Sequence, residues 1–291
     1  MKVYQYDAFA MQANMGNPAG IVLQANNLSD EAMQKIAHLL GFNETAFILH
    51  SSVADIKIRY FTPGHEMNLC GHGTVASLIA LNHQSGRSDI KTIETKAGII
   101  EARINKSSTL VTVIMKQLPA KFDFFIGDES KLAAVLGLDE NDIEKKWPIV
   151  YGSTGIWTLL VPIKKLSTFK KMSPQTKNFP QVLKQLSHCS IHPFCLETIH
   201  QKAQMHARHF SSPYSGTIED PVTGTASGVM GAYYLKYIKD TDYISILVEQ
   251  GQEMGKDGCI AVIANKNKDI INVSIEGRGI FVKEINLNYQ V

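Results

Sequence analysis

Two stretches of the chain have the composition of helices with almost no polar face. They are Gly73–Asn82 (GTVASLIALN) and Thr225–Lys236 (TASGVMGAYYLK), in which small residues alternate with large apolar ones. A helix that is apolar all round has to be buried all round. A sheet that curls around the helix is the simplest host, so the sequence predicts two buried central helices.

Short strand-like stretches fill most of the remaining chain. In Asp55–Thr62, apolar Ile56, Ile58 and Tyr60 alternate with polar residues, which is the period of a half-buried strand. Two amphipathic helices are also expected, Asp30–Leu40 and Glu129–Leu136, each with an acidic start and a glycine behind it. The other predicted strands are Val3–Phe9, Ile21–Gln24, Ala46–His50, Ile90–Glu94, Leu110–Met115, Trp157–Pro162, Met205–Phe210, Ile244–Val248, Ile260–Ala264, Ile271–Ile275 and Ile280–Ile285.

The length of 291 residues fits two domains at roughly 100–200 residues each. The starts of the two central helices are alike: aligning Cys70-Gly71 with Thr223-Gly224 gives an offset of 153 residues, which is consistent with an internal duplication. We therefore expect two similar domains of strands around one helix. The expected ranges are 1–118 with central helix 73–82, completed by the C-terminal strand at about 278–291, and 119–277 with central helix 225–238.

Composition excludes several classes of protein. Lys and Arg (29) nearly balance Asp and Glu (27), which argues against a partner such as a nucleic acid. Four scattered cysteines do not form a disulfide framework. The start resembles no signal peptide, and no apolar stretch approaches the ~20 residues that span a bilayer. We expect a reduced, soluble, cytoplasmic protein with no membrane partner.

The starts of the two central helices are candidate binding sites. A helix N-terminus offers unpaired N–H groups and the positive end of the helix dipole. Gly71, Gly73 and Gly224 would let a ligand approach the backbone closely. If both starts face one cleft, they form a carboxylate or phosphate site. The alternative is that the glycines only ease the turn from strand to helix.

Polar side chains near these starts are candidate catalytic groups. His72 lies in a first helical turn, where the dipole predicts a neutral imidazole that donates a hydrogen bond or relays a proton. Glu44, beside an apolar strand, would have a raised pKa suited to general acid–base catalysis, or else is solvated surface. Asp220 either stabilises the turn or takes part in chemistry. Cys70 is either a thiolate favoured by the helix start or a buried apolar side chain.

A run of potential zinc ligands has a simpler interpretation. His188–Cys195 (HCSIHPFC) contains two histidines and two cysteines, but it alternates as a strand would and lacks a second ligand pair. His65, Glu66, Cys70 and His72 form a looser set without metalloprotease spacing. We predict no metal site at either set.

Several runs of residues, in order along nearly the whole chain, resemble the phenazine biosynthesis-like (PhzF) isomerase family. Their order and coverage make the resemblance specific. The matching runs are Asp7-Ala8-Phe9, Gly16–Gly20 (GNPAG), Asn43–Phe47 (NETAF), Arg59–Pro63 (RYFTP), Cys70–Thr74 (CGHGT), Ser153–Ile156 (STGI), Arg208-His209-Phe210, Glu219–Gly228 (EDPVTGTASG), Glu249-Gln250-Gly251 and Met254-Gly255.

The resemblance implies a fold, an active site and an activity. The fold is α+β and diaminopimelate epimerase-like, with two similar domains, each a curved, mostly antiparallel, barrel-like sheet around a central helix, and the active site between them. Glu44 would move a proton between carbons of a small carboxylated metabolite, assisted by His72 and Asp220. It implies no metal or organic cofactor and a homodimer. The implied substrate-binding residues are Asn17, Gly71, Gly73, Gly224 and Thr225.

One departure bears on the mechanism. Epimerases and racemases of this fold use two cysteines, one before each central helix, whereas this chain has Cys70 and Thr223. We therefore expect an isomerase that uses one carboxylate. The alternatives are an epimerase, racemase or dehydratase that uses Cys70 with another partner, and a non-catalytic metabolite-binding relative.

Overall fold

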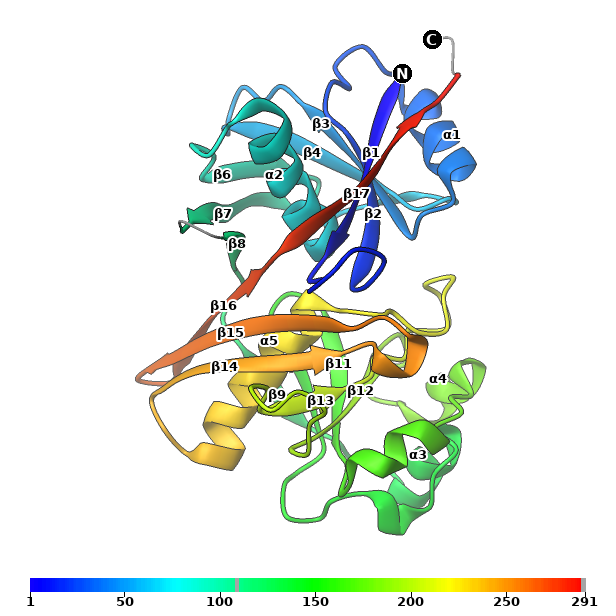
Figure 1. Ribbon diagram of the computed structural model, residues 1–291. Helices are drawn as coiled ribbons and strands as arrows, with labels where there is room; N and C mark the ends of the chain where they lie inside the picture. Colours follow the sequence, from blue (N-terminus) through cyan, green and yellow to red (C-terminus); the bar gives the residue numbers. More distant parts are fainter. Residues whose placement is uncertain (108–109, 289–291) are drawn as a thin grey trace. The chain divides into compact units, whose positions relative to one another are not determined.

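A computed structural model describes residues 1–107 and 110–288 of the chain (Figure 1). The chain divides into two compact units. Unit 1 consists of residues 1–116 and the chain from residue 276 onward, and unit 2 consists of residues 117–275. The fold is mixed α+β and dominated by curved, mostly antiparallel sheet, as expected. The last residues of the expected C-terminal strand, 289–291, lie outside the described residues.

Unit 1 is a sheet curved around α2 (Gly71–Ser85), the first of the expected central helices. The helix contacts β1, β2, β3, β8 and β17, so strands from both ends of the chain enclose it. The remaining elements of the unit are β1 (Lys2–Ala8), β2 (Asn17–Val22), α1 (Asp30–Leu40), β3 (Glu44–Leu49), β4 (Ile56–Phe61), β5 (Glu66–Met67), β6 (Thr92–Thr95), β7 (Gly98–Lys106), β8 (Val111–Lys116) and β17 (Gly279–Asn286).

Unit 2 repeats this plan around α5 (Gly224–Tyr233), which contacts β10, β14 and β15. Short helices cover another part of its sheet. The remaining elements are β9 (Lys121–Phe124), α3 (Glu129–Val135), η1 (Glu140–Asp142), β10 (Val150–Ser153), β11 (Trp157–Pro162), η2 (Leu166–Lys171), η3 (Thr176–Asn178), α4 (Phe179–Val182), β12 (Ser190–Cys195), β13 (Met205–Ala207), η4 (Tyr234–Lys239), β14 (Tyr243–Gln250), η5 (Gln252–Met254), β15 (Gly258–Asn267) and β16 (Ile270–Gly277).

The central helices are buried on every side, as their composition predicts. Residues 72–81 of α2 are all buried, and so is nearly every residue of α5. The helices begin at Gly71 and Gly224, which are 224 minus 71, or 153, residues apart. The expected start of α2 at Gly73 is wrong by two residues, because Cys70 caps the helix and brings both glycines into its first turn. Beyond Tyr233, α5 continues as the π-helical turn η4 rather than as α-helix.

Several strands were not predicted, among them β7 and β10. All four residues of β10 are buried, and apolar and polar residues do not alternate there. In β7 they do alternate, from Ile100 to Asn105, although most of its residues are exposed. The expected strand Met205–Phe210 ends at Ala207, although Phe210 forms isolated bridges to Ile191 and Glu219.

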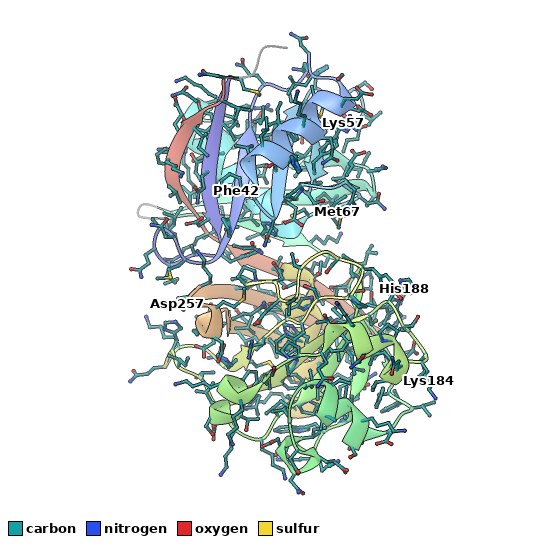
Figure 2. All side chains as sticks on the ribbon, turned by 90° about the vertical axis from the view of Figure 1, so that its right-hand side faces the viewer. Phe42, Lys57, Met67, Lys184, His188 and Asp257 are labelled. Atoms are coloured by element: carbon teal, nitrogen blue, oxygen red, sulfur yellow. The ribbon has the colours of Figure 1, made fainter. Side chains whose placement is uncertain are left out.

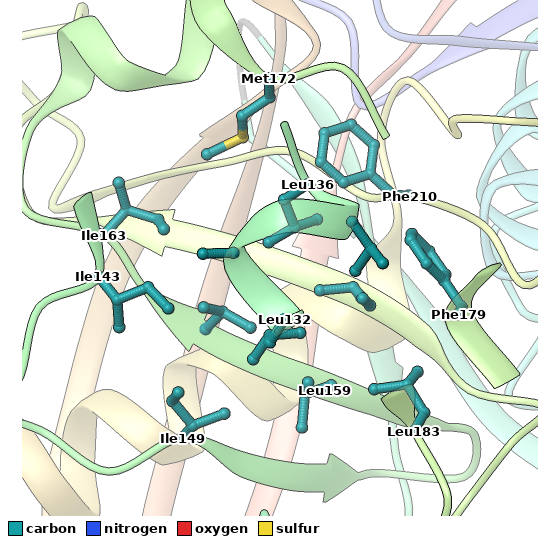
Figure 3. Packing of buried hydrophobic residues seen from close by; sticks show 14 of the residues in the cluster. Leu132, Leu136, Ile143, Ile149, Leu159, Ile163, Met172, Phe179, Leu183 and Phe210 are labelled. Carbon is teal, nitrogen blue, oxygen red and sulfur yellow. The ribbon is translucent and has the colours of Figure 1, made fainter. Parts of the chain in front are cut away.

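Each unit has its own apolar core outside the central helix. In unit 2, Leu132 and Leu136 of the α3 region pack against strand residues such as Leu159, together with Phe179 and Phe210 (Figure 3). In unit 1, the buried face of α1 packs on Phe47 and its neighbours. Both peripheral helices are therefore amphipathic, as predicted. None of the helices in the described ranges is long and apolar enough to cross a membrane.

Candidate active site

Three side chains of unit 1 meet where two strands and a helix begin. Asn17 is the first residue of β2 and Glu44 the first of β3, and these strands are parallel, with Ala19 opposite Glu44. Because parallel strands start at the same edge of a sheet, both residues lie at one edge. His72, in the first turn of α2, is buried at this edge and contacts both.

The Glu44 carboxylate and the His72 imidazole form a close pair. Glu44 Oε2 lies 3.1 Å from His72 Nε2, and the two side chains are 17% and 8% exposed. Burial by itself would raise the pKa of Glu44, but the imidazole outweighs burial and holds the pKa below its ordinary value of 4.5. The expected raised pKa of Glu44 is therefore wrong, because the sequence does not show that a cation lies beside this carboxylate.

The pairing also changes the charge of His72. Burial alone would lower the pKa of His72, yet Cys70 and Glu44 raise it well above 6.5. Because the Cys70 thiol stays protonated near pH 7, the carboxylate is the group that stabilises the imidazolium. The prediction of a neutral His72 is wrong, since a carboxylate in contact outweighs the helix dipole.

Cys70 is the N-cap of α2. Its Sγ accepts a hydrogen bond from Gly73 N–H at 3.2 Å and lies 3.4 Å from His72 Nδ1. A Cβ at Gly73 would lie 3.1 Å from the sulfur and 3.2 Å from the Tyr60 ring, so either neighbour would have to shift by a few tenths of an ångström. Burial raises the pKa of Cys70, so of the two alternatives for this residue the structure favours the buried thiol over the thiolate. The thiol nevertheless borders the same imidazole as Glu44.

The second nitrogen of His72 has two neighbours. Nδ1 lies 3.3 Å from Asn17 Nδ2 and 3.4 Å from Cys70 Sγ. A neutral ring with its proton on Nε2 accepts from the Asn17 amide, whereas an imidazolium needs an acceptor at Nδ1, such as sulfur or the amide oxygen. If the side-chain amide of Asn17 rotates, it can present either its NH₂ group or its oxygen to His72 Nδ1. Asn17 can therefore hydrogen-bond to His72 in both protonation states.

In unit 2, the turn before α5 is held by a network centred on Gln250. The buried Gln250 amide accepts from Thr223 N–H at 3.1 Å through Oε1 and donates from Nε2 to the Asp220 carbonyl at 2.8 Å. The Thr223 hydroxyl donates to Asp220 Oδ2 at 2.5 Å. Gln250 was not among the residues predicted for this site. Its place in the Glu249-Gln250-Gly251 run was the only signal.

The start of α5 leaves backbone N–H groups for a ligand. Thr223 is the N-cap, as Cys70 is for α2, but its side chain makes no capping hydrogen bond. The carbonyls of Gly224 and Thr225 accept from Gln117 Nε2 and Thr154 Oγ1, each at 3.1 Å, which fixes the turn. N–H groups at an uncapped helix start suit an anion.

Glu219, the neighbour of Asp220, has a structural partner. Arg208 Nε and Nη2 donate to its two carboxylate oxygens at 2.8 and 2.6 Å, and Arg208 Nη1 donates to the Phe169 carbonyl at 2.8 Å. A bidentate pair of this kind fixes direction as well as distance. The Arg208–Glu219 pair thus anchors the chain one residue before Asp220.

The side chains that lie close enough together to bind a metal ion are not the two sets that stand out in the sequence. In His188–Cys195, Ile191 and Cys195 face an apolar core, whereas His192 lies 3.2 Å from His209. Ser190–Cys195 of this run forms β12, so its strand-like interpretation is confirmed for those residues. Across the described residues, the groups of three ligating atoms within 4.8 Å of one another are Glu44, Cys70 and His72, and, in unit 2, His200, Asp257 and Cys259.

The predicted site residues thus form two sets. Asn17, Glu44, Cys70 and His72 meet in unit 1, with Gly71 and Gly73 in the same helical turn. Asp220, Gly224 and Thr225 lie together at the start of α5 in unit 2. No expected site residue falls outside these two sets.

The chain is similar to known proteins over almost its whole length. Residues 6–285 match the family described as phenazine biosynthesis-like protein (PhzC-PhzF). The "uncharacterized isomerase" YfhB of Bacillus subtilis (strain 168) is 48% identical, with 96% of each chain covered. The crystal structure of a Bacillus anthracis phenazine biosynthesis protein of the PhzF family superposes with a TM-score of 0.95 at 49% identity, covering 99% of both chains.

More distant structures share the fold alone. A hydroxyproline epimerase from Agrobacterium vitis is 12% identical to the chain and has a TM-score of 0.59, with 98% of this chain and 91% of that chain covered. The expected similarity of fold to epimerases and racemases is therefore confirmed.

Proposed function

Because this isomerase belongs to the phenazine biosynthesis-like (PhzC-PhzF) family, we propose that it moves a proton between carbons of a small carboxylated metabolite, with Glu44 as the acid–base group. The observation that carries the proposal is the pair of Glu44 and His72 at the start of a buried helix. Neither the proton transfer nor the binding of a carboxylate, as proposed, requires a cofactor.

The first step is removal of a proton from carbon. The ionised Glu44 carboxylate takes the C–H proton, and the electron pair of that bond moves into the π system of the substrate. Pairing with His72 lowers the pKa of Glu44, so the group is ionised at neutral pH. A lower pKa weakens a base and strengthens its conjugate acid, so Glu44 then readily returns the proton to a second carbon. The net reaction relocates one proton and one double bond without oxidation or reduction.

Binding of the substrate is assigned to the helix starts. The N–H groups of α2 around Gly71, and those of the uncapped start of α5 at Gly224 and Thr225, suit a carboxylate. Such donors stabilise negative charge that develops when the C–H bond breaks. Asp220, held by Thr223 and Gln250, would orient polar groups of the substrate. The expectation that both helix starts bind one substrate stays a prediction.

A second candidate function is favoured by one observation. Cys70 Sγ lies 3.4 Å from His72 Nδ1, so the imidazole borders a thiol as well as a carboxylate. The neutral form of His72 could take the thiol proton, and the resulting thiolate could act as the base of an epimerase, racemase or dehydratase. Thr223 argues against the two-thiol version, because its hydroxyl donates to Asp220 and is not a thiol.

Solvent hydrogen exchange distinguishes these functions. Wild-type protein is incubated in heavy water with a panel of small carboxylated metabolites, and deuterium entering a carbon-bound position is followed by mass spectrometry. For any metabolite that exchanges, we expect Glu44→Gln to slow exchange by about 10²–10⁴-fold, the usual contribution of a general acid–base group. Cys70→Ser is the matched control beside the same histidine and should keep exchange within about tenfold of wild type.

Other outcomes have definite meanings. Exchange at the wild-type rate in folded Glu44→Gln protein would overturn the assignment of Glu44. The thiol mechanism would be favoured if Cys70→Ser lost the exchange activity and if substrate protected Cys70 of the wild-type protein from alkylation. A metabolite that binds without any exchange in the wild type would identify a non-catalytic binding protein.

A further inference from the structure

A second group of metal-ligating side chains lies in unit 2, among residues that the proposed reaction does not use. His200 Nε2 lies 2.7 Å from Asp257 Oδ1, and one ligating atom each of His200, Asp257 and Cys259 lie within 4.8 Å of one another. These residues come from three places: the turn after β12, the residue before β15, and β15 itself. Figure 2 labels Asp257 beside the short η5.

Strand register places this group next to a buried polar row. His206 of β13 lies opposite Glu249 of β14, and Glu249 lies opposite Cys259 of β15. Directly opposite residues point to the same face of a sheet. His206 and Glu249 are fully buried and joined at 2.8 Å, and His206 Nε2 lies 3.1 Å from Glu253. Buried charged groups are costly unless they are paired and hydrogen-bonded, as these are.

The surrounding groups fix the candidate ligands in position. The Glu249 carboxylate accepts from the backbone N–H groups of Ile199 and His200 at 2.7 and 2.8 Å, which holds the turn that carries the imidazole. Gln252 Nε2 donates to Asp257 Oδ1 at 2.9 Å and orients that carboxylate. Outer hydrogen bonds of this kind are typical around metal ligands.

One buried oxygen beside this group lacks a hydrogen bond. Among the described residues, Gln252 Oε1 is inaccessible to solvent and has no partner, although the other end of the same amide holds Asp257. A buried carbonyl oxygen without a donor is costly. A cation at the group would provide its partner, so Gln252 offers a fourth ligand atom.

We propose that His200, Asp257, Cys259 and Gln252 form a zinc site. Imidazole, carboxylate and thiolate are ligands that zinc accepts together, and the thiolate disfavours magnesium and calcium. Zinc bond lengths of about 2.0–2.3 Å place ligand atoms roughly 3.2–3.8 Å apart in a tetrahedron. His200 and Asp257, whose polar atoms are 2.7 Å apart, would therefore separate slightly. The imidazole and carboxylate can move, because their side chains are 37% and 31% exposed.

Bound zinc would tie three segments of unit 2 together. It would join the turn at His200, the segment from Gln252 to Asp257, and β15. Gln250, which precedes the second segment, holds Asp220 and Thr223 at the start of α5. The zinc site is therefore structural and does not depend on Glu44 or on the proposed reaction.

Cobalt and zinc binding to the full-length chain tests the site. Metal-free protein is titrated with Co²⁺, which reports thiolate ligation by a charge-transfer absorption, and Zn²⁺ affinity is measured by competition with a chromophoric chelator. We expect one ion per chain at this site and a Tm that rises by roughly 5–10 °C when zinc exceeds its Kd about 100-fold. Cys259→Ser should abolish the absorption and weaken zinc binding more than about 100-fold, because loss of outer partners alone costs 10–100-fold.

Two further variants keep the result interpretable. His200→Gln changes a partly exposed side chain, so it should fold even if Cys259→Ser does not, and it should weaken zinc binding to a similar extent. Cys70→Ser removes the thiol of the Glu44, Cys70 and His72 group and should leave the absorption intact. Absence of the absorption in wild-type protein would overturn the proposal. The proposal would also be overturned if Cys70→Ser lost the charge-transfer absorption while His200→Gln kept it.

Discussion

At the scale of single residues, the chemistry of the candidate site depends on which groups are in contact. Glu44 and His72 are 28 positions apart in the chain, yet their polar atoms lie 3.1 Å apart. This contact reverses both expected pKa shifts: the Glu44 pKa falls and the His72 pKa rises. Because each charge stabilises the other, the resting state of the pair is carboxylate and imidazolium.

The pair predicts the pH dependence of the exchange reaction. Glu44 has to be ionised to take a proton, so kcat/KM should fall only below pH 4.5, its ordinary pKa, on the acid side. The imidazolium persists until its raised pKa is passed, so the alkaline fall should lie well above pH 6.5. The measurement is kcat/KM for deuterium exchange across the pH range in which the protein stays folded.

The control for the pH profile is His72→Gln. Without the imidazole, burial is the largest remaining influence on Glu44, so the acid limb should move to higher pH and the alkaline limb should disappear. An alkaline fall centred at pH 6.5 in wild-type protein would contradict the ion pair.

At the scale of elements, backbone geometry joins the end of β14 to the turn before α5. Gln250 is the last residue of the strand, and its amide bonds to both sides of that turn. Gly251 follows with a φ of +102°, and a Cβ on it would lie 2.0 Å from the Lys256 carbonyl and 2.7 Å from the Pro221 carbonyl. The end of β14, the segment from Gln252 to Asp257 and the turn of Asp220 thus pack backbone against backbone.

We predict that Gly251→Ala destabilises the protein more than Gly255→Ala. Both glycines have positive φ, which costs an alanine about 1–2 kcal/mol. A Cβ at Gly255 meets nothing within 4 Å, so that variant should lose only this amount. At Gly251 the collision with two carbonyls adds overpacking, for a total of about 2–5 kcal/mol. The free energy of unfolding is measured by urea denaturation, and equal losses in the two variants would contradict the argument.

At the scale of the whole molecule, one plan occurs twice. Each unit wraps its sheet around a buried helix whose start carries polar residues, and the helices begin 153 residues apart. Unit 1 is built from both ends of the chain, because β17 pairs with β1. Neither terminal segment can therefore be removed without opening this sheet.

We propose that the protein is a homodimer, as its family resemblance implies. Sedimentation velocity at several concentrations should give twice the mass of the 291-residue chain, with no monomer at micromolar concentration. A stable dimer of this kind buries about 1,200–2,000 Å². A single monomeric species at all concentrations would contradict the proposal. The cytoplasmic location stays a prediction.

Much of the fold was predictable from local pattern. The bounds of α1 and β11 agree with the prediction, since caps and alternation are local signals. The two apolar helices indicated their own burial, and burial on all sides requires a sheet around them. A strand with no alternation, such as β10, carried no such signal.

The sequence by itself determined which residue types stand at the helix starts and the strand ends, and so the class of chemistry available. Only the tertiary structure decided their charges and partners. Glu44 is a carboxylate with a low pKa because α2 brings His72 to the start of β3. Likewise, Gln250 became a partner of Asp220 through the end of β14. Electrostatic and hydrogen-bond energies depend on distances of a few ångströms between groups that are remote in the chain, and folding sets those distances.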